Sequence, residues 1–161
     1  MTIPEMMKML EGLKKQALSM QEKIVAKETK EEQKNPADRL TTFCLAIQEH
    51  EGWFPPSKRN SKGSVAWRNN NPGNLKCLAY RNPLASGIDP LGFCVFPDSL
   101  TGMIALKQMI RNAAEGKSKY YYPAMTLTKF FSKYAPASDD NQPILYAKAV
   151  AKKLGVDPDT F

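Results

Sequence analysis

The chain of 161 residues is poor in metal-binding side chains and has no long apolar run. It contains one histidine, His50, and three cysteines, Cys44, Cys77 and Cys94, without the paired spacing of a zinc site. No run approaches the roughly 20 apolar residues that a membrane-spanning helix requires. We therefore expect no metal, no cofactor and no membrane span.

The first 24 residues do not read as a signal peptide. They are charged throughout and lack both a continuous apolar segment and a small-residue cleavage site. We therefore expect synthesis in a cytoplasm, where free thiols are the default state of cysteines. Cys44 lies on a helical apolar stripe and is interpreted as a core residue. Cys77 and Cys94 could still meet across the irregular middle of the chain and form a disulfide.

Positive charge is concentrated in the second part of the chain. Residues 37–161 hold sixteen Lys and Arg against ten Asp and Glu, whereas residues 1–36 hold seven lysines against six glutamates. A basic domain attracts polyanions, whether nucleic acid or the anionic polymers of a bacterial wall. No nucleic-acid-binding motif accompanies the charge, so we expect no nucleic-acid partner.

The N-terminal segment differs in pattern from the rest. Apolar residues from Ile3 to Ile24 recur at spacings of three and four, and residues 27–34 are polar all round. This predicts an amphipathic helix and polar spacer over residues 1–35, followed by one domain over residues 36–161. The stripe over residues 3–24 could pack on that domain, self-associate or dock on a virion or another partner.

A helix is predicted to begin near Pro36. Asn35 can cap it, and proline is favoured at the first helical position. Apolar residues then recur at helical spacing and share one face. They are Leu40, Phe43, Cys44 and Ile47.

Glu51 continues this apolar face, because it follows Ile47 by four residues, whereas Glu49 falls roughly opposite. Desolvation disfavours the ionised form of a carboxyl group, so an acid placed like Glu51 can hold a proton and donate it. The plainer interpretation is a solvated glutamate at the end of a helix that Gly52 caps.

Amide side chains gather in the segment Arg68-Asn69-Asn70-Asn71-Pro72-Gly73-Asn74-Leu75. Its last four-residue turn, Asn71-Pro72-Gly73-Asn74, has proline second and glycine third, which predicts a type II turn. The asparagines could all serve the turn, or some could bind a ligand, and composition alone does not choose.

Several blocks together resemble phage and bacterial lysozyme-like cell-wall lytic enzymes of the lytic transglycosylase kind. The resemblance covers roughly residues 38–161, although Gly73-Asn74-Leu75 stands near the place where the larger superfamily usually has Gly-Leu-Met-Gln. The blocks are Glu51-Gly52-Trp53, the asparagine-rich segment, Gly92-Phe93-Cys94-Val95-Phe96-Pro97-Asp98, Thr126-Leu127, Tyr134-Ala135-Pro136, Asp140-Asn141-Gln142-Pro143, Tyr146 and Leu154-Gly155-Val156.

The resemblance implies a lysozyme-like α+β domain, mainly α, with a small irregular sheet. It also implies that Glu51 is the catalytic residue and that the asparagine turn and aromatic residues of the C-terminal half line a sugar groove. The substrate-binding residues implied are Asn71, Asn74, Phe93, Tyr134 and Asn141.

The implied reaction cleaves the β-1,4 bond between N-acetylmuramic acid and N-acetylglucosamine in peptidoglycan glycan strands. Glu51 would protonate the leaving oxygen and then act as a base while the 6-hydroxyl of the muramic acid attacks. A hydrolase would instead need a second acid, for which Asp89 and Asp98 are the candidates. Such an enzyme, made in the cytoplasm, would reach the wall with a virion or at lysis.

Two other classes stay open. A Cys/His amidase or peptidase would need a cysteine to meet His50, although Cys44 and His50 point in different directions on one helix. A non-catalytic wall-binding or virion structural protein could use the same fold, because a fold does not secure a function.

The remaining segments predict the scaffold. Residues 53–97 are rich in Gly, Pro, Asn and Ser, with short strands expected at residues 65–67 and 93–96. Helices are expected from Ser99 to Gly116, over residues 127–134, and after Asn141 through Ile144, Ala147, Ala151 and Leu154 to Gly155.

Overall fold

The computed structural model describes residues 36–58, 60–77 and 82–160, with the side chains of residues 36–38 left out. The chain divides into two units, Met1–Arg39 and Leu40–Phe161. The predicted N-terminal helix, its association stripe over residues 3–24 and the polar spacer lie outside the described residues.

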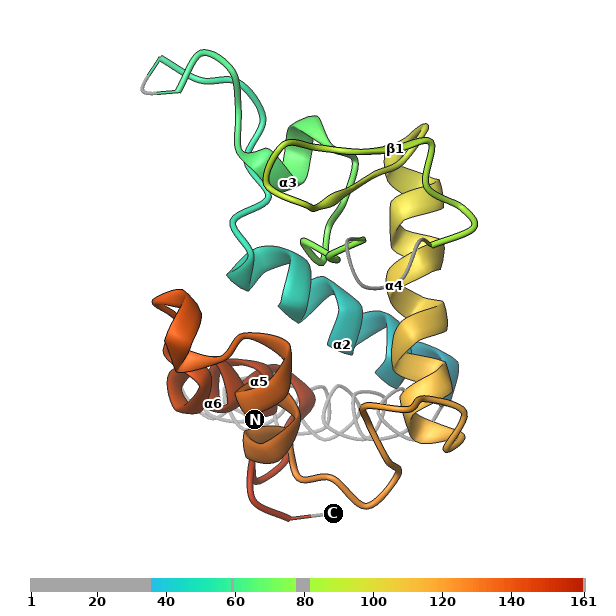
Figure 1. Ribbon diagram of the computed structural model, residues 1–161. Helices are drawn as coiled ribbons and strands as arrows, with labels where there is room; N and C mark the ends of the chain where they lie inside the picture. Colours follow the sequence, from blue (N-terminus) through green and yellow to red (C-terminus); the bar gives the residue numbers. More distant parts are fainter. Residues whose placement is uncertain (1–35, 59, 78–81, 161) are drawn as a thin grey trace, which may run out of the picture. The chain divides into compact units, whose positions relative to one another are not determined.

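The described residues are mainly helical with one small antiparallel sheet (Figure 1), which confirms the expected α+β, mainly α class. In the sheet, Gly87 pairs with Val95 and Ile88 with Cys94. No helix within the described ranges is long and apolar enough to cross a membrane. The elements are α2 (Pro36–His50), α3 (Val65–Arg68), β1 (Gly87–Ile88), β2 (Cys94–Val95), α4 (Ser99–Ala114), α5 (Leu127–Tyr134), the 3-10 helix η1 (Ala137–Asp139) and α6 (Pro143–Leu154).

Helix α2 begins at Pro36, as predicted, and ends in a Schellman motif. The N–H of Gly52 donates to the carbonyl of Glu49 at 3.2 Å, and the N–H of Trp53 donates to that of Gln48 at 3.2 Å. Gly52 has a φ of 71°, the left-handed conformation that this motif requires and that glycine adopts without strain. Glu51 is therefore the last residue before the chain turns away from the helix.

The later helices follow their predicted bounds, with one different cap. Asp98, rather than Ser99, caps α4, because its Oδ1 accepts a hydrogen bond from the N–H of Thr101 at 2.7 Å. The Thr126 hydroxyl caps α5 in the same way. Helix α6 starts with a proline and ends before Gly155, which again has a positive φ.

The main hydrophobic core lies between α2, α4, α5 and α6. Helices α5 and α6 pack against each other (Figure 1), and both contribute aromatic rings to this core. The buried face of α6 differs from the periodicity noted in the sequence, because Ile144 is 56% exposed. The buried residues of α6 are Tyr146, Ala147, Val150 and Ala151.

The expected strand at residues 65–67 is wrong, because these residues form α3. The Ser64 hydroxyl accepts a hydrogen bond from the N–H of Trp67 at 3.2 Å, so a serine cap outweighs the strand preference of the β-branched Val65. The strand expected at residues 93–96 is present in shortened form as β2, and Phe93 forms an isolated bridge with Lys76.

Cys77 and Cys94 form a disulfide, so the default expectation of free thiols is wrong for this pair. Backbone pairing brings them together: the N–H of Cys94 donates to the carbonyl of Leu75 at 2.8 Å, and the N–H of Cys77 donates to that of Gly92 at 2.8 Å. Their Cα atoms are 5.0 Å apart, within the range of native disulfides. Cys44 is free and buried.

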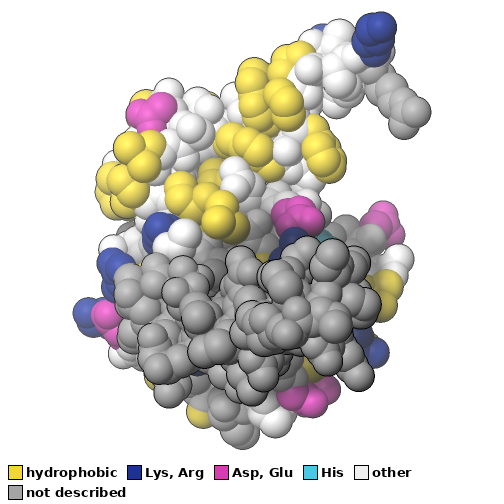
Figure 2. Space-filling model, turned by 180° about the vertical axis from the view of Figure 1, so that it is seen from behind, with side chains coloured by type: hydrophobic (Ala, Val, Ile, Leu, Met, Phe, Trp, Pro, Cys, Tyr) yellow, Lys and Arg dark blue, Asp and Glu magenta, His cyan; other side chains and the backbone are white. Residues whose placement is uncertain are grey.

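The sheet region (residues 64–77 and 82–97) has only a small apolar core. Cys77, Cys94 and Phe96 form a cluster with Ala105 of α4. Hydrophobic side chains gather on the surface of the half that carries α3 and the strands (Figures 1 and 2). Because the apolar cluster is small, hydrogen bonds and the disulfide also hold this region together.

Candidate functional site

Glu51 is partly buried and held by side chains from two distant parts of the domain. Its Oε1 accepts a hydrogen bond from the hydroxyl of Tyr146 at 2.8 Å. Its Oε2 accepts one from the side-chain amide of Asn74 at 2.9 Å. Each carboxylate oxygen therefore has its own neutral donor, and the carboxyl group has a defined orientation.

Tyr146 comes from the buried face of α6. Burial, reinforced by the neighbouring Tyr134 and Glu51, raises the pKa of Tyr146 far above its usual value. The phenol therefore stays protonated and remains a donor to Glu51. The His50 ring stacks on the Tyr146 ring with centroids 3.7 Å apart, which limits movement of the phenol.

Residues 71–74 form a turn, but the type II prediction is wrong. The N–H of Asn74 donates to the carbonyl of Asn71 at 3.0 Å, which closes the turn, yet Gly73 lacks the positive φ that type II requires. Asn74 itself has a φ of 44°, in the left-handed region that asparagine tolerates. In this backbone conformation the Asn74 side chain donates its hydrogen bond to Glu51.

Close packing explains why residue 73 is a glycine. A Cβ at this position would lie 2.8 Å from Cδ1 of Leu106 and 2.8 Å from the hydroxyl oxygen of Tyr134. The Tyr134 hydroxyl donates to the carbonyl of Gly73 and so fixes the turn from α5. Burial raises the pKa of Tyr134 well above its usual value, and the charge of Glu51 adds to this effect.

The other asparagines of the segment hold the scaffold together. Asn69 donates to Oδ2 of Asp89 at 2.7 Å, and Asn70 donates to the carbonyl of Phe96 at 3.1 Å. The fully buried Asn71 donates to two carbonyls and accepts the N–H of Leu75. Only Asn74, of the four, reaches Glu51.

Asp89 and Asp98, the candidates for a second acid, both serve local structure. Oδ1 of Asp89 accepts the N–H groups of Leu91 and Phe93, each at 2.9 Å. Desolvation raises the pKa of Asp89, but the hydrogen bonds from Asn69 and these N–H groups more than offset it, and the net shift is downward. The hydrogen bond from Thr101 likewise lowers the pKa of Asp98, which is fully exposed. Among the described residues, neither carboxylate shares a hydrogen-bond partner with Glu51.

Phe93 and Asn141 remain apart from the polar contacts at Glu51 in the described part of the chain. Phe93 is half-buried in its bridge with Lys76. Asn141 is exposed, and its amide lies 3.5 Å from the carbonyl of Pro136.

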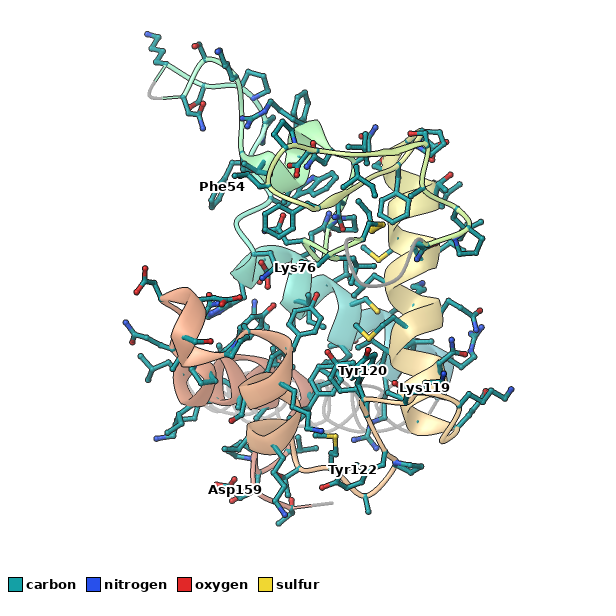
Figure 3. All side chains as sticks on the ribbon, in the orientation of Figure 1. Phe54, Lys76, Lys119, Tyr120, Tyr122 and Asp159 are labelled. Atoms are coloured by element: carbon teal, nitrogen blue, oxygen red, sulfur yellow. A yellow bond between two sulfur atoms is a disulfide. The ribbon has the colours of Figure 1, made fainter. Side chains whose placement is uncertain are left out.

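Lys76 joins the sheet region to η1. Its Nζ lies 2.7 Å from Oδ2 of Asp139, and both side chains are largely exposed, so this ion pair contributes little stability. Lys76 is labelled in Figure 3, as is the exposed Phe54 of the loop after α2.

The geometry separates Glu51 from Glu49, as the helical periodicity predicts. Glu49 is exposed and pairs with Lys153 at 2.9 Å.

The Cys/His alternative lacks a reactive thiol, because Cys77 and Cys94 are bonded to each other and burial raises the pKa of Cys44 to about 12. No group of three potential metal ligands occurs within the described ranges.

Tyr146 fits the resemblance noted in the sequence, but it was not predicted as a residue of this site. Its buried neighbours Ala147, Val150 and Ala151 lie one, four and five residues further on, which marks an inward helical face. A tyrosine on such a face needs a partner for its hydroxyl, and that need was the available signal.

Comparison with protein-family models, with curated proteins and with solved structures found no match to this chain.

Proposed function

We propose that this protein is a peptidoglycan-degrading enzyme with a lysozyme-like fold, and that Glu51 is its general acid and base. The observation that carries the proposal is the half-buried carboxyl group of Glu51, held by Tyr146 and Asn74. A catalytic acid must be fixed relative to the bond that it protonates, and two donors from different segments supply that orientation.

The favoured reaction is that of a lytic transglycosylase. In that reaction one carboxyl group first protonates the glycosidic oxygen and then accepts the proton of the substrate's own 6-hydroxyl, so a second acid is not required. The structural roles of Asp89 and Asp98 agree with a site that has a single catalytic carboxyl group. A two-carboxylate hydrolase is less compatible with these roles.

Asn74 has a second function in this proposal. While its amide nitrogen donates to Glu51, its Oδ1 is buried and has no hydrogen-bond partner within the described residues. A buried acceptor without a partner costs about 1–3 kcal/mol, and a hydroxyl or N-acetyl N–H of an amino sugar would satisfy it. Asn74 would thus link the orientation of Glu51 to the position of the substrate.

Analysis of the fragments released from purified wall tests the reaction. We expect soluble muropeptides with 1,6-anhydro ends. Reducing ends would identify a hydrolase, and free peptides would identify an amidase. If no fragment appears although the protein binds wall, the chain is a non-catalytic wall-binding protein and the proposal is wrong.

Asn74→Ala is expected to reduce the rate of fragment release by up to roughly tenfold, because a lost side-chain hydrogen bond is worth about 0.5–1.5 kcal/mol. Asn112→Ala is the matched control, since the Asn112 side chain accepts a hydrogen bond from Gln108 on the same helix, α4. Initial rates on wall and thermal melts of both variants provide the measurement. If Asn74→Ala melts much earlier while its folded fraction keeps full activity, Asn74 only supports the turn.

Tyr146→Phe should also lower the rate by roughly tenfold, because it removes the donor to Oε1 of Glu51 while keeping the ring. The stacked ring of His50 should keep its contact, so the melting temperature should change little. Tyr120→Phe, at a highly exposed tyrosine, is the control. Equal rates for the two variants would contradict the assignment of Tyr146 as a positioning residue.

A further inference from the structure

The Cys77–Cys94 disulfide links the segment that follows the Asn74 turn to β2. Cys77 follows Asn74 by three residues, and both cysteines are almost fully buried. The carbonyl of Cys94 accepts a hydrogen bond from the Asn71 side chain at 3.0 Å, and the N–H of Cys94 donates to Leu75 at 2.8 Å. The disulfide and the turn thus share the same short stretch of backbone.

Apart from the disulfide, hydrogen bonds and a short sheet join this stretch to β2: the Asn71 side chain donates to the carbonyl of Cys94, and the N–H of Cys94 donates to that of Leu75. The sheet is two residues long on each strand, and the Lys76–Phe93 pairing is a single bridge. The local apolar cluster consists mainly of the two cysteines themselves with Phe96 and Ala105. Breaking the disulfide removes the covalent cross-link between this stretch and β2 and leaves these hydrogen bonds and the small apolar cluster to hold it.

We propose that the Cys77–Cys94 disulfide is a redox switch for the site at Glu51. In the oxidised protein the bond holds the segment after Asn74 against β2, which keeps the Asn74 amide on Glu51. In the reduced protein that segment gains freedom and Asn74 loses its fixed position. The inference rests on the proposed wall-degrading function. Such a switch would keep the enzyme weakly active in a reducing cytoplasm and fully active in an oxidising environment.

The chemistry is thiol–disulfide exchange. A dithiol reductant supplies two electrons and two protons, the S–S bond breaks to give two thiols, and the reductant becomes a disulfide. Oxidised glutathione reverses the reaction, because it accepts the two electrons and two protons and leaves as two thiols. A displacement of catalytic groups by about 1 Å costs up to roughly 100-fold in rate, so we expect reduction to lower the rate by roughly 10- to 100-fold.

The experiment compares full-length oxidised protein with protein reduced by dithiothreitol, at a temperature where circular dichroism shows that both are folded. Release of soluble fragments from purified wall gives the rate, and the NMR resonances of the Asn74 side-chain amide report its contact with Glu51. We expect the reduced protein to be slower, its Asn74 resonances to shift, and oxidised glutathione to restore both.

Two variants complete the test. The double variant Cys77→Ala/Cys94→Ala should behave like the reduced protein and not respond to dithiothreitol. Cys44→Ala should respond like the wild type, because Cys44 lies in the helical core apart from the disulfide.

The inference is overturned if folded reduced protein keeps the oxidised rate with unchanged Asn74 resonances. It is also overturned if reduction unfolds the whole domain, since the disulfide would then be a general stabiliser. An oxidised protein that releases no fragments would instead contradict the proposed function, and the Asn74 resonances would still decide whether reduction releases the turn.

Discussion

Replacing Glu51 by glutamine is expected to abolish the release of wall fragments while the domain stays folded. The amide preserves the size of the side chain but cannot donate the proton that the leaving oxygen requires. Loss of a general acid typically costs roughly 10²- to 10⁴-fold in rate, which would bring fragment release close to background. Asn74 can still donate to the amide oxygen, and the Tyr146 hydroxyl can accept a hydrogen bond from the amide nitrogen, so the melting temperature should fall only slightly.

Glu49→Gln is the control for this experiment. Glu49 lies in α2 two residues before Glu51, but its side chain is 68% exposed and pairs with Lys153 at the surface. We expect this variant to keep most of its activity. Initial rates on purified wall, measured beside circular dichroism spectra of both variants, provide the comparison. Equal residual activity in the two variants would refute the assignment of Glu51.

Gly102→Ala is expected to have the largest effect on stability. Helix α4 approaches the asparagine segment so closely at Gly102 that a Cβ would lie 1.8 Å from the carbonyl oxygen of Asn70 and 2.8 Å from Cδ of Pro72. The helix or the turn must move to relieve this overlap, because backbone atoms cannot rotate away. Forced overpacking typically lowers the free energy of unfolding by about 1–3 kcal/mol, and a backbone clash belongs at or above the upper end.

Gly87→Ala provides the matched substitution, because the nearest heavy atom to its Cβ would be 4.0 Å away. Urea unfolding should show a large decrease for Gly102→Ala and a small change for Gly87→Ala. The remaining folded Gly102→Ala protein should also be slow on wall, because the displaced turn carries Asn74. A stability equal to that of the wild type would show that α4 does not rest on the turn in this way.

Helix bounds could be predicted because their signals are local. Pro36, Thr126 and Gly155 act through backbone geometry or hydrogen bonds within one helical turn. The structure of the sheet region was harder to predict from the sequence, because it depends on contacts between distant segments. The disulfide follows from the pairing of Lys76 with Phe93, and local sequence carries no information about that register.

The candidate site likewise combines a part that local sequence predicts with a part that depends on distant contacts. Helical periodicity places Glu51 on the inner face of α2 and separates it from Glu49, so this part could be derived from the sequence. The role of Tyr146 could not, because its hydroxyl meets Glu51 across 95 positions of sequence. The different roles of the asparagines could not be predicted either, since residue type alone does not show that Asn71 is buried and that Asn74 contacts Glu51.

The contacts of Glu51 also set an order of events in folding. Asn74 lies 23 positions from Glu51 and Tyr146 lies 95 positions away, so the site closes only after α6 has docked. Contacts between distant residues form late, because the chain loses loop-closure entropy before they contribute. During synthesis the nascent chain would therefore hold Glu51 without its phenol donor until α6 has left the ribosome. The order of synthesis would thus leave the proposed site incomplete until the end of the chain has been made.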